Sequence, residues 1–545
     1  MRTLPANTDR GFRFLGLDRV ERFFAYEALR EEAERRAAHL QARGVGRGDR
    51  VAIVVAEPHE FVLTFLGVVT AGAAPVPVYP RAGFKKLDAY VEVLAHVMRE
   101  SGAELACCLP GNREVVERAR AHAGTLREVL EVPAAFEGTP PAFVTPDLGP
   151  DDLCFLQFTS GSTSKPKGVQ VSHGNLVANA SAFLGPHGLD RNDDDLGVSW
   201  LPLFHDMGLI GFVLGTLVMD IPVVLLPTES FARSPRLWVE QITKHRGTIT
   251  FAPNFAYQLV TRRVKERHLA ALDLSSLRVA GSGAEPIRAK TLEGFAAHFA
   301  PAGFDAKAFL PCYGMAESTL AITFHALGAP MRVDRVDPVA LREGRAEATD
   351  AEEAIEIVGC GRPFPDHDLR LVSDAGDDVG EREVGEVWVR GPSVTAGYFQ
   401  RPDATAEAFA EGGYLRTGDL AYRADGDLFI CGRVKDLIIV RGANHHPQDI
   451  EWAVGDLEGV RRGNVFAFSV LRDGTEELVV AAEAHSADAA SLRERVAEEV
   501  AAKFGLKPGH VAVVPLGTLP KTSSGKAQRR KAKALYEAGA LEEHP

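Results

Sequence analysis

The sequence predicts an α/β protein built from a large N-terminal region and a smaller C-terminal one. Apolar runs typical of buried strands alternate with helical patterns through the first region, and a new apolar run begins at residues 436–440. A chain of 545 residues is also too long for one hydrophobic core, and at about 150 residues a unit it indicates three or four units. The new apolar run places the domain boundary at Lys435. We therefore expect two domains, residues 1–434, which would contain several of these units, and residues 435–545.

The N-terminal region begins with an amphipathic helix and a strand–helix–strand unit. Over residues 22–43, apolar side chains recur at helical spacing among Glu and Arg. The run 51–55 predicts a buried strand, a helix follows to about Ala71, and residues 74–78 predict a second strand. This order is typical of parallel α/β layering. A polar, Pro-containing connection over residues 132–150 separates this unit from the next.

The alternation continues through the middle of the chain. Strands are predicted at residues 223–226, 248–252 and 277–280, with helical stretches between them. Residues 369–372 and 385–390 instead alternate between apolar and polar side chains, which predicts antiparallel sheet. The large region therefore combines mainly parallel sheets with a β-rich part, and the last 110 or so residues are enough to fold as a unit.

Composition and charge narrow the class of function. The formal net charge of −13 argues against broad nucleic-acid binding, which depends on basic surface. The most apolar run, residues 209–219, is interrupted by Asp220 and Pro222 well short of a membrane span, and the first residues lack a signal peptide, so we expect a cytoplasmic protein. Six cysteines without a C-x-x-C pair are expected to be buried thiols.

A loop rich in hydroxyl groups lies between the apolar run 153–158 and the run 169–171. Its small residues allow backbone N–H groups to approach an anion, and its two lysines add positive charge. The spacing differs from that of the common P-loop, which disfavours a kinase or GTPase, and a flexible surface linker is the alternative. The candidate phosphate-binding residues are Thr159, Ser160, Gly161, Ser162, Thr163, Lys167 and Gly168.

This loop resembles the signature of the adenylate-forming enzymes, the superfamily of acyl-CoA synthetases, luciferases and peptide-synthetase adenylation domains. Further stretches resemble the motifs of that superfamily in the same order, so the resemblance covers nearly the whole chain. These stretches are residues 199–209, 281–286, 313–319, 414–420, 432–436 and 519–529. The resemblance implies the adenylate-forming fold, in which a small, mobile α+β C-terminal domain follows a large domain of several subdomains.

The resemblance also implies a role for each matching residue. Adenine would be held by Gly283, Ala284, Glu285, Pro286, Tyr313, Gly314, Met315 and Ala316. Asp419 would accept hydrogen bonds from the ribose hydroxyls with the cation of Arg433 nearby, and Lys435 would be the hinge. Glu317 and Thr159 would hold Mg²⁺, a hard ion that suits oxygen ligands.

The reaction that the resemblance implies is carboxylate adenylation with ATP and Mg²⁺ as cofactors. The substrate carboxylate attacks the α-phosphate of ATP and pyrophosphate leaves, so catalysis is mostly positioning and charge neutralisation. Lys526 would bridge the carboxylate and the α-phosphate, and His205 would line the acyl site. An alternative for the cations between Lys521 and Lys533 is a basic tail for nucleic acid or membrane.

Three stretches, residues 253–257, 311–314 and 441–451, resemble the fatty acyl-AMP ligases more than the CoA ligases. That branch implies a fatty acid as substrate, held by residues that include Asn254, Phe255 and Ala256. It also implies transfer to the phosphopantetheine of an acyl carrier protein, a separate chain of a polyketide or nonribosomal peptide pathway. Members carry an insertion, here about residues 331–356, that packs on the large domain and hinders the rotation needed for thiolation by CoA.

Two other functions stay open. A long-chain acyl-CoA synthetase would use the same motifs. It would transfer the acyl group to CoA instead of a carrier protein, so an assay with each acceptor would identify it. An inactive nucleotide-binding scaffold would have kept the fold without the chemistry. The presence of Lys526, Glu317 and Asp419 argues against such a scaffold.

Overall fold

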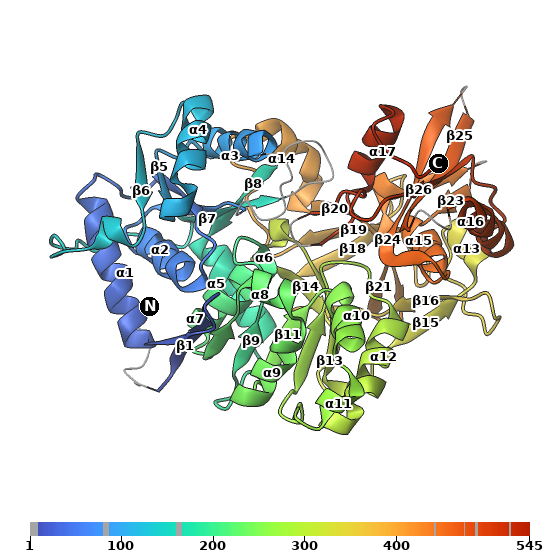
Figure 1. Ribbon diagram of the computed structural model, residues 1–545, viewed down its shortest axis with the longest axis horizontal. Coiled ribbons are helices and arrows are strands. Elements are labelled where there is room, and N and C mark those ends of the chain that lie inside the picture. Colours follow the sequence, from blue (N-terminus) through green and yellow to red (C-terminus); the bar gives the residue numbers. More distant parts are fainter. Residues whose placement is uncertain are drawn as a thin grey trace.

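The computed structural model describes residues 9–79, 87–159, 166–440, 443–472, 475–485, 489–522 and 525–545. Its elements confirm the predicted α/β class (Figure 1). The largest sheet has nine strands in the order β17-β14-β13-β12-β11-β9-β10-β1-β2. Its strands are β1 (Gly11–Leu15), β2 (Glu21–Ala25), β9 (Gly197–Ser199), β10 (Val223–Leu225), β11 (Ile249–Ala252), β12 (Val279–Ser282), β13 (Phe309–Gly314), β14 (Ala321–Phe324) and β17 (Arg362–Pro363).

The centre of this sheet is parallel, as the middle of the sequence predicts. The strands from β1 through β10, β9, β11 and β12 to β13 pair in parallel, and β2, β14 and β17 add antiparallel edges. Its helices are α5 (His173–Leu184), α6 (Asp206–Leu209), α7 (Gly215–Val218), α8 (Thr228–Arg233), α9 (Arg236–His245), α10 (Asn254–Arg263), α11 (Glu266–Leu269) and α12 (Ala289–Phe299). Between α6 and α7, the residues Ile210–Leu214 form one π-helical turn, η3.

A second parallel sheet has the order β4-β3-β5-β6 and lies at the upper left of Figure 1 with α3 and α4. Its strands and the neighbouring helices are α1 (Tyr26–Gln41), β3 (Arg50–Val54), α2 (Pro58–Thr70), β4 (Ala74–Pro77), α3 (Leu87–Ser101), β5 (Leu105–Cys108), α4 (Arg113–Ala123) and β6 (Glu128–Glu131). The predicted strand–helix–strand unit is therefore confirmed.

The helix predicted over residues 22–43 is wrong at its beginning. It starts at Tyr26, because residues 21–25 form β2 and pair with β1 at the edge of the large sheet. Phe23 stands opposite Arg13, whose guanidinium lies 4.3 Å from the centre of the phenylalanine ring. Pairing with an existing sheet edge thus overrides the helical spacing of the side chains.

Antiparallel pairs make up the rest of the large region. The hairpin of β7 (Leu153–Thr159) and β8 (Lys167–Ser172) confirms two strands flanking the hydroxyl-rich loop. The predicted antiparallel sheet is also present, as β18 (Asp368–Val372), β19 (Gly385–Arg390), β20 (Leu415–Ala424) and β21 (Asp427–Arg433). The helix α14 (Pro402–Ala408) lies between β19 and β20 in the chain.

The insertion forms a small unit of its own, with β15 (Val333–Val336), α13 (Pro338–Arg342) and β16 (Ile355–Val358). Its buried side chains include Val336 and Leu341, which join Tyr422 and Phe429 of the antiparallel sheet in one hydrophobic cluster. The segment thus packs on the large region, and its helix α13 also contacts the C-terminal strand β23.

The elements after Lys435 have hydrophobic clusters made only of residues 438–541. The sheet β24-β25-β26 and the pair β22-β23 form this part, which lies at the right of Figure 1. Its elements are β22 (Ile438–Val440), β23 (Ala443–His445), α15 (Pro447–Gly455), β24 (Val460–Arg472), β25 (Thr475–Ala484), α16 (Ala489–Phe504), β26 (His510–Val514) and α17 (Arg529–Glu537).

Two other expectations concern the whole chain. Of the helices that the structure describes, none combines the length and apolar character needed to cross a bilayer. The six cysteines have free thiols, and five of them are buried, while Cys312 is partly exposed.

Candidate active site

A cavity of about 2390 Å³ separates the C-terminal elements from the large region. It brings together residues that lie far apart in the sequence. The predicted site residues that line it are Thr159, Lys167, His205, Asn254, Phe255, Ala284, Glu285, Pro286, Tyr313, Gly314, Met315, Ala316, Glu317, Asp419, Arg433, Lys435 and Lys526.

The remaining predicted residues are placed differently. Ala256 is fully buried in the hydrophobic core and does not line the cavity. Gly168 and Gly283 lie behind the lining, where an added Cβ would come within 3.0 Å of the Phe158 ring and 2.6 Å of the Cys312 sulfur, respectively. The predictions at Ser160, Gly161, Ser162 and Thr163 fall outside the residues that the structure describes.

The two ends of the phosphate-loop candidate are held firmly. Thr159 and Lys167 stand opposite each other in the β7–β8 hairpin, so both ends of the loop leave the sheet at one point. His96 of α3 contacts the carbonyl oxygen of Pro166 through Nε2 at 3.0 Å. The ammonium nitrogen of Lys167 lies 4.7 Å from the ring centre of Tyr398, within the range of a cation–π contact.

Glu317, the candidate metal ligand, also contacts Tyr398. The Tyr398 hydroxyl donates a hydrogen bond to Oε1 of Glu317 at 2.8 Å. Burial raises the pKa of Glu317, although this hydrogen bond opposes the shift. Burial and the nearby Glu317 charge also raise the pKa of Tyr398, so the phenol keeps its proton and stays a donor.

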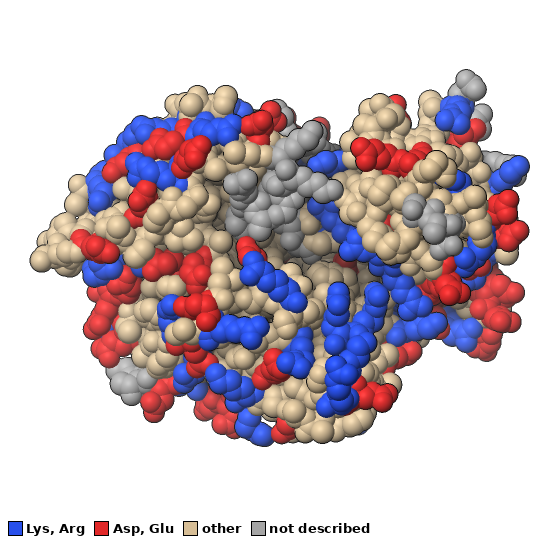
Figure 2. Space-filling view, viewed as in Figure 1, with Lys and Arg blue, Asp and Glu red and all other residues tan. Residues whose placement is uncertain are grey.

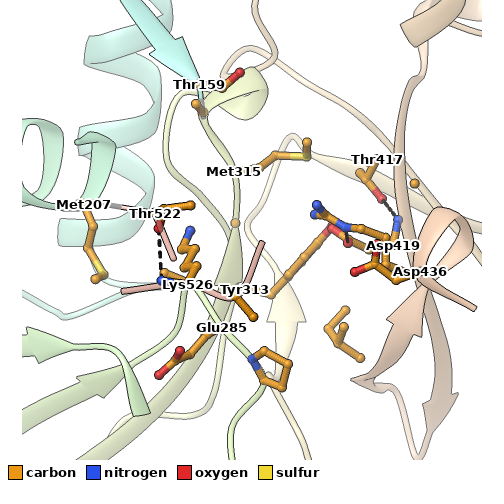
Figure 3. A pocket seen from close by; sticks show the side chains of 18 of the residues that line it. Thr159, Met207, Glu285, Tyr313, Met315, Thr417, Asp419, Asp436, Thr522 and Lys526 are labelled. Carbon is orange, nitrogen blue, oxygen red and sulfur yellow. Dashed lines mark hydrogen bonds and ion pairs between the residues drawn. The ribbon is translucent and has the colours of Figure 1, made fainter. Parts of the chain in front are cut away.

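His205, Asp206 and Lys526 line the cavity near one another. Nδ1 of His205 lies 2.5 Å from Oδ1 of Asp206. Burial would raise the pKa of Asp206, but the neighbouring His205 and the charge of Lys526 hold it at about 2. The backbone of the Lys526 loop is fixed from Thr522, whose hydroxyl accepts from the Lys526 N–H at 3.0 Å. Figure 3 shows Lys526 on the same side of the cavity as Glu285, with Asp419 on the opposite side.

Asp419 is held by an aromatic and a cationic partner. Tyr313 donates to Oδ2 at 2.8 Å, and Nε of Arg433 donates to Oδ1 at 2.7 Å. The Asp419 charge raises the pKa of the Arg433 guanidinium, so the guanidinium keeps its proton and stays a donor. The carboxylate is therefore oriented and able to accept further hydrogen bonds from a ligand.

The candidate adenine turn follows β12 and approaches the start of α10. Ala284 has a φ of +68°, a left-handed conformation that a side chain larger than a methyl would strain. Oε1 of Glu285 accepts the backbone N–H of Phe255 at 2.7 Å. The first turn of α10 and the turn after β12 are therefore fixed to each other at the cavity wall.

One branch of the cavity is apolar and enters the large region. Its lining includes Phe183, Leu184, Gly197, Phe212, Ile249 and Phe251. These residues come from α5, the π-helical turn and the parallel strands β9 and β11. An added Cβ at Gly197 would lie only 3.2 Å from the Phe212 ring, so the glycine allows that ring to pack closely against β9.

Charge on the face in Figure 2 is unevenly distributed. Acidic and basic side chains mix over most of it, and Lys and Arg side chains gather beside the hollow between the two parts of the molecule. Because the whole chain carries −13, this is a local concentration of positive charge. Such a rim attracts anionic ligands toward the cavity.

The sequence did not point to Tyr398, although it contacts both Lys167 and Glu317. An aromatic residue after a glycine is common, and its two partners are distant in the chain. Glu386 was missed as well, and its Oε1 accepts the backbone N–H of Gly418 at 3.1 Å beside Asp419. The signal for both residues is spatial, so only the fold could have found them.

Comparisons with known proteins identify the family of the chain. The family model described as AMP-binding enzyme matches residues 13–399, and the model described as Disco-interacting protein 2-like, AMP domain, matches residues 435–544. A protein of Caulobacter vibrioides named putative acyl-CoA synthetase is 40% identical over 527 residues, covering 94% of this chain and 90% of the relative.

Two further matches are informative. The medium-chain-fatty-acid–[acyl-carrier-protein] ligase JamA of Moorena producens is 32% identical, covering 95% of this chain and 90% of the relative. A structure from studies of fatty acyl-adenylate ligases of E. coli and L. pneumophila aligns with a TM-score of 0.92 at 35% identity, covering 98% and 96% of the two chains. That likeness confirms the adenylate-forming fold. The chain belongs to the AMP-binding enzyme family.

Proposed function

We propose that the protein is a fatty acyl-AMP ligase, which activates a fatty acid to its acyl-adenylate with ATP and then passes the acyl group to a carrier-protein thiol. The observation that carries the proposal is the single cavity lined by both Asp419 and Lys526 and extended by an apolar branch. Such a cavity can hold a nucleotide at one end and an alkyl chain at the other, with the reacting atoms between them.

The residues divide the chemistry between them. Asp419 holds the ribose beside Arg433, the turn at Ala284 and the Tyr313 strand hold adenine, and the loop ending at Lys167 holds the phosphates. Lys526 neutralises the charge that develops as the carboxylate attacks the α-phosphate, close to His205. No side-chain nucleophile is needed, because the acid itself is the nucleophile.

A magnesium ion fits the carboxylate of Glu317. Among the described residues no group of three or more His, Cys, Asp or Glu side chains could hold a metal. Magnesium in phosphoryl-transfer sites is typically bound by one or two carboxylates with substrate phosphates and water. Glu317 and the Thr159 hydroxyl would therefore hold Mg²⁺ together with ATP, where it neutralises the leaving pyrophosphate.

The chain divides at Lys435 into residues 1–434 and a mobile domain of residues 435–545. Two observations support this division: the separate hydrophobic clusters of residues 438–541 and the few polar contacts that the described residues make between the two parts. One of those contacts joins Arg288 and Asp456 through Nη1 and Oδ1 at 3.1 Å. Because Lys526 lines the cavity, this arrangement corresponds to the adenylation half of the reaction.

The acyl acceptor would be the phosphopantetheine of an acyl carrier protein. The relative JamA is named as a carrier-protein ligase, whereas the Caulobacter vibrioides relative is named as an acyl-CoA synthetase. The second name keeps an acyl-CoA synthetase as the alternative function. Both enzymes would form the same acyl-adenylate, so only the acceptor separates them.

The test measures pyrophosphate release and identifies acyl-adenylates by mass spectrometry, using acids of increasing chain length. Fatty acids, but not short acids, should release pyrophosphate. CoA and a phosphopantetheinylated carrier protein are then offered separately. Pyrophosphate release with no acid would contradict the proposal, and efficient acyl-CoA formation would favour the alternative.

A variant of the apolar branch tests where the alkyl chain lies. Gly211→Leu should shift the preference toward shorter acids, because Gly211 lines the cavity next to Phe212 and an added Cβ there would meet only the Leu320 side chain, at 3.6 Å. Gly111→Leu is the control, since a Cβ at that surface glycine meets nothing within 4 Å. An unchanged chain-length profile in a folded Gly211→Leu variant would place the alkyl chain elsewhere.

A further inference from the structure

We propose that Tyr398 is a positioning residue that holds Glu317 and Lys167 together, so that the metal carboxylate and the phosphate-binding lysine meet Mg·ATP as one preformed unit. The inference rests on the proposed adenylation and adds a residue to it. Tyr398 lines the cavity and touches both partners, through its hydroxyl and through its ring.

The ring position is set by the backbone around it. Val169 of β8 forms an antiparallel bridge with Tyr398. On either side, the Gln170 N–H donates to the Gly397 carbonyl at 3.0 Å, and the Phe399 N–H donates to the Gly168 carbonyl at 2.8 Å. The segment that carries the tyrosine is therefore paired with the phosphate-loop hairpin through this bridge, which fixes its ring beside Lys167.

The same segment also holds the Glu317 region. The Thr395 N–H donates to the Glu317 carbonyl at 2.9 Å, and the Tyr398 hydroxyl donates to the carboxylate at 2.8 Å. Backbone and side chain of Glu317 are thus both tied to residues 395–398. These residues connect the hairpin that ends the phosphate loop to the turn that carries the metal ligand.

This arrangement has the form of an outer-shell contact at a metal site. A ligating carboxylate is usually oriented by a hydrogen-bond donor, and loss of that donor typically costs about 10- to 100-fold in metal affinity or activity. The hydroxyl contact engages one carboxylate oxygen, Oε1, and so sets the direction in which the carboxylate of Glu317 faces. The ring contact with Lys167 is independent of the hydroxyl, so two variants separate the two roles.

The first variant is Tyr398→Phe, which keeps the ring beside Lys167 and removes only the hydroxyl. We expect the Mg²⁺ concentration for half-maximal pyrophosphate release to rise about 10-fold or more. Calorimetry should show weaker binding of ATP in the presence of Mg²⁺ and unchanged binding of ATP in its absence. Tyr398→Leu removes the ring as well and should weaken ATP binding in both conditions.

Tyr414→Phe is the matched control. Its hydroxyl also donates to a carboxylate, that of Asp368, and the Arg390 guanidinium lies 4.6 Å from its ring centre. Tyr414 is not among the residues that line the cavity, so its variant should leave the Mg²⁺ dependence unchanged. Thermal unfolding of both variants reports any loss of stability that the two hydroxyl deletions share.

A double-mutant cycle tests whether Tyr398 acts through Glu317. The Tyr398→Phe effect on Mg²⁺ dependence should disappear in the Glu317→Gln background, because the carboxylate to be oriented is gone. Equal effects in both backgrounds, or a wild-type Mg²⁺ dependence in Tyr398→Phe, would overturn the inference. A wild-type protein that neither binds Mg·ATP nor releases pyrophosphate would instead refute the proposed function.

Discussion

Arg433 donates a hydrogen bond from Nε to Oδ1 of Asp419 at 2.7 Å, and it does so as the last residue of β21, two positions before Lys435. The candidate ribose carboxylate and the proposed hinge are therefore connected by one side chain. Since Tyr313 binds the other carboxylate oxygen, Asp419 is fixed from both sides before a nucleotide arrives.

The first prediction is that Asp419→Ala raises the KM for ATP by at least about tenfold, because hydrogen bonds to a charged acceptor contribute about 1.5 to 3 kcal/mol each. Pyrophosphate release as a function of ATP concentration measures it. Asp368→Ala is the control, since that carboxylate also accepts from a tyrosine but does not line the cavity. An unchanged KM would contradict the ribose assignment.

The second prediction separates binding from catalysis. Lys526→Ala should lower adenylate formation by about a thousandfold or more and leave ATP affinity nearly intact, because the lysine acts on charge that develops in the transition state. Lys533→Ala on the exposed face of α17 should change neither quantity. If ATP affinity and turnover fall together, Lys526 contributes to ground-state binding instead.

The structure shows how much of the fold and of the site can be predicted from the sequence alone. Its strand patterns predict the α/β class, and its motif order predicts a set of residues of which most line the cavity, because both depend on local residue type. The pairing of β2 with β1 and the burial of Ala256 depend on partners far along the chain. Such contacts have no local signature, and Tyr398 was missed for the same reason.

The insertion at about residues 331–356 is a second case in which the local sequence does not reveal the packing partners. The segment is polar overall, yet Val336, Leu341 and Ala346 are buried in one cluster with Tyr422 and Phe429. A few apolar side chains are enough when a neighbouring sheet offers the rest of the core. The sequence of the segment alone cannot show which surface completes it.

The third prediction concerns pH. Burial, with Glu451 nearby, raises the pKa of Asp449 to about 7 from the value of 3.8 expected in an unfolded chain. Between these values the folded protein keeps a proton that the unfolded chain has lost, so the contribution of Asp449 is complete below pH 3.8 and is lost as the pH rises through about 7. The free energy of unfolding should fall with pH over this window.

Asp449→Asn cannot ionise and removes this dependence. The difference in unfolding midpoint between the variant and the wild type should therefore move in favour of the variant from about pH 5 to about pH 8. His446 has the opposite trend with pH, because burial lowers its pKa to about 4. Both proteins contain His446, so its contribution cancels in the difference. A difference that stays constant with pH would show that Asp449 is ionised in the folded protein.

The fourth prediction concerns the insertion as a limit on CoA use. Helix α13 contacts strand β23, which lies beyond the proposed hinge. Burial and the nearby positive charge of Arg342, a residue of α13, lower the pKa of His445 in β23 to about 4. A bias of about 3 kcal/mol toward the adenylating arrangement would suppress the thiolating one more than a hundredfold. Loosening this contact should therefore release the rotation that thiolation requires.

The variant replaces Pro338–Arg342 with a Gly/Ser linker of equal length. It removes Leu341 from the cluster but keeps β15 and β16, which retain Val336 and Ile357 beside Tyr422 and Phe429. Adenylate formation should be preserved and acyl-CoA should become measurable by mass spectrometry when CoA is supplied. Arg345→Ala, which removes only exposed ion pairs of the same insertion, is the control. If a folded linker variant forms the adenylate but still makes no acyl-CoA, the insertion does not limit CoA use. Efficient acyl-CoA formation by the wild-type enzyme would contradict the hypothesis as well.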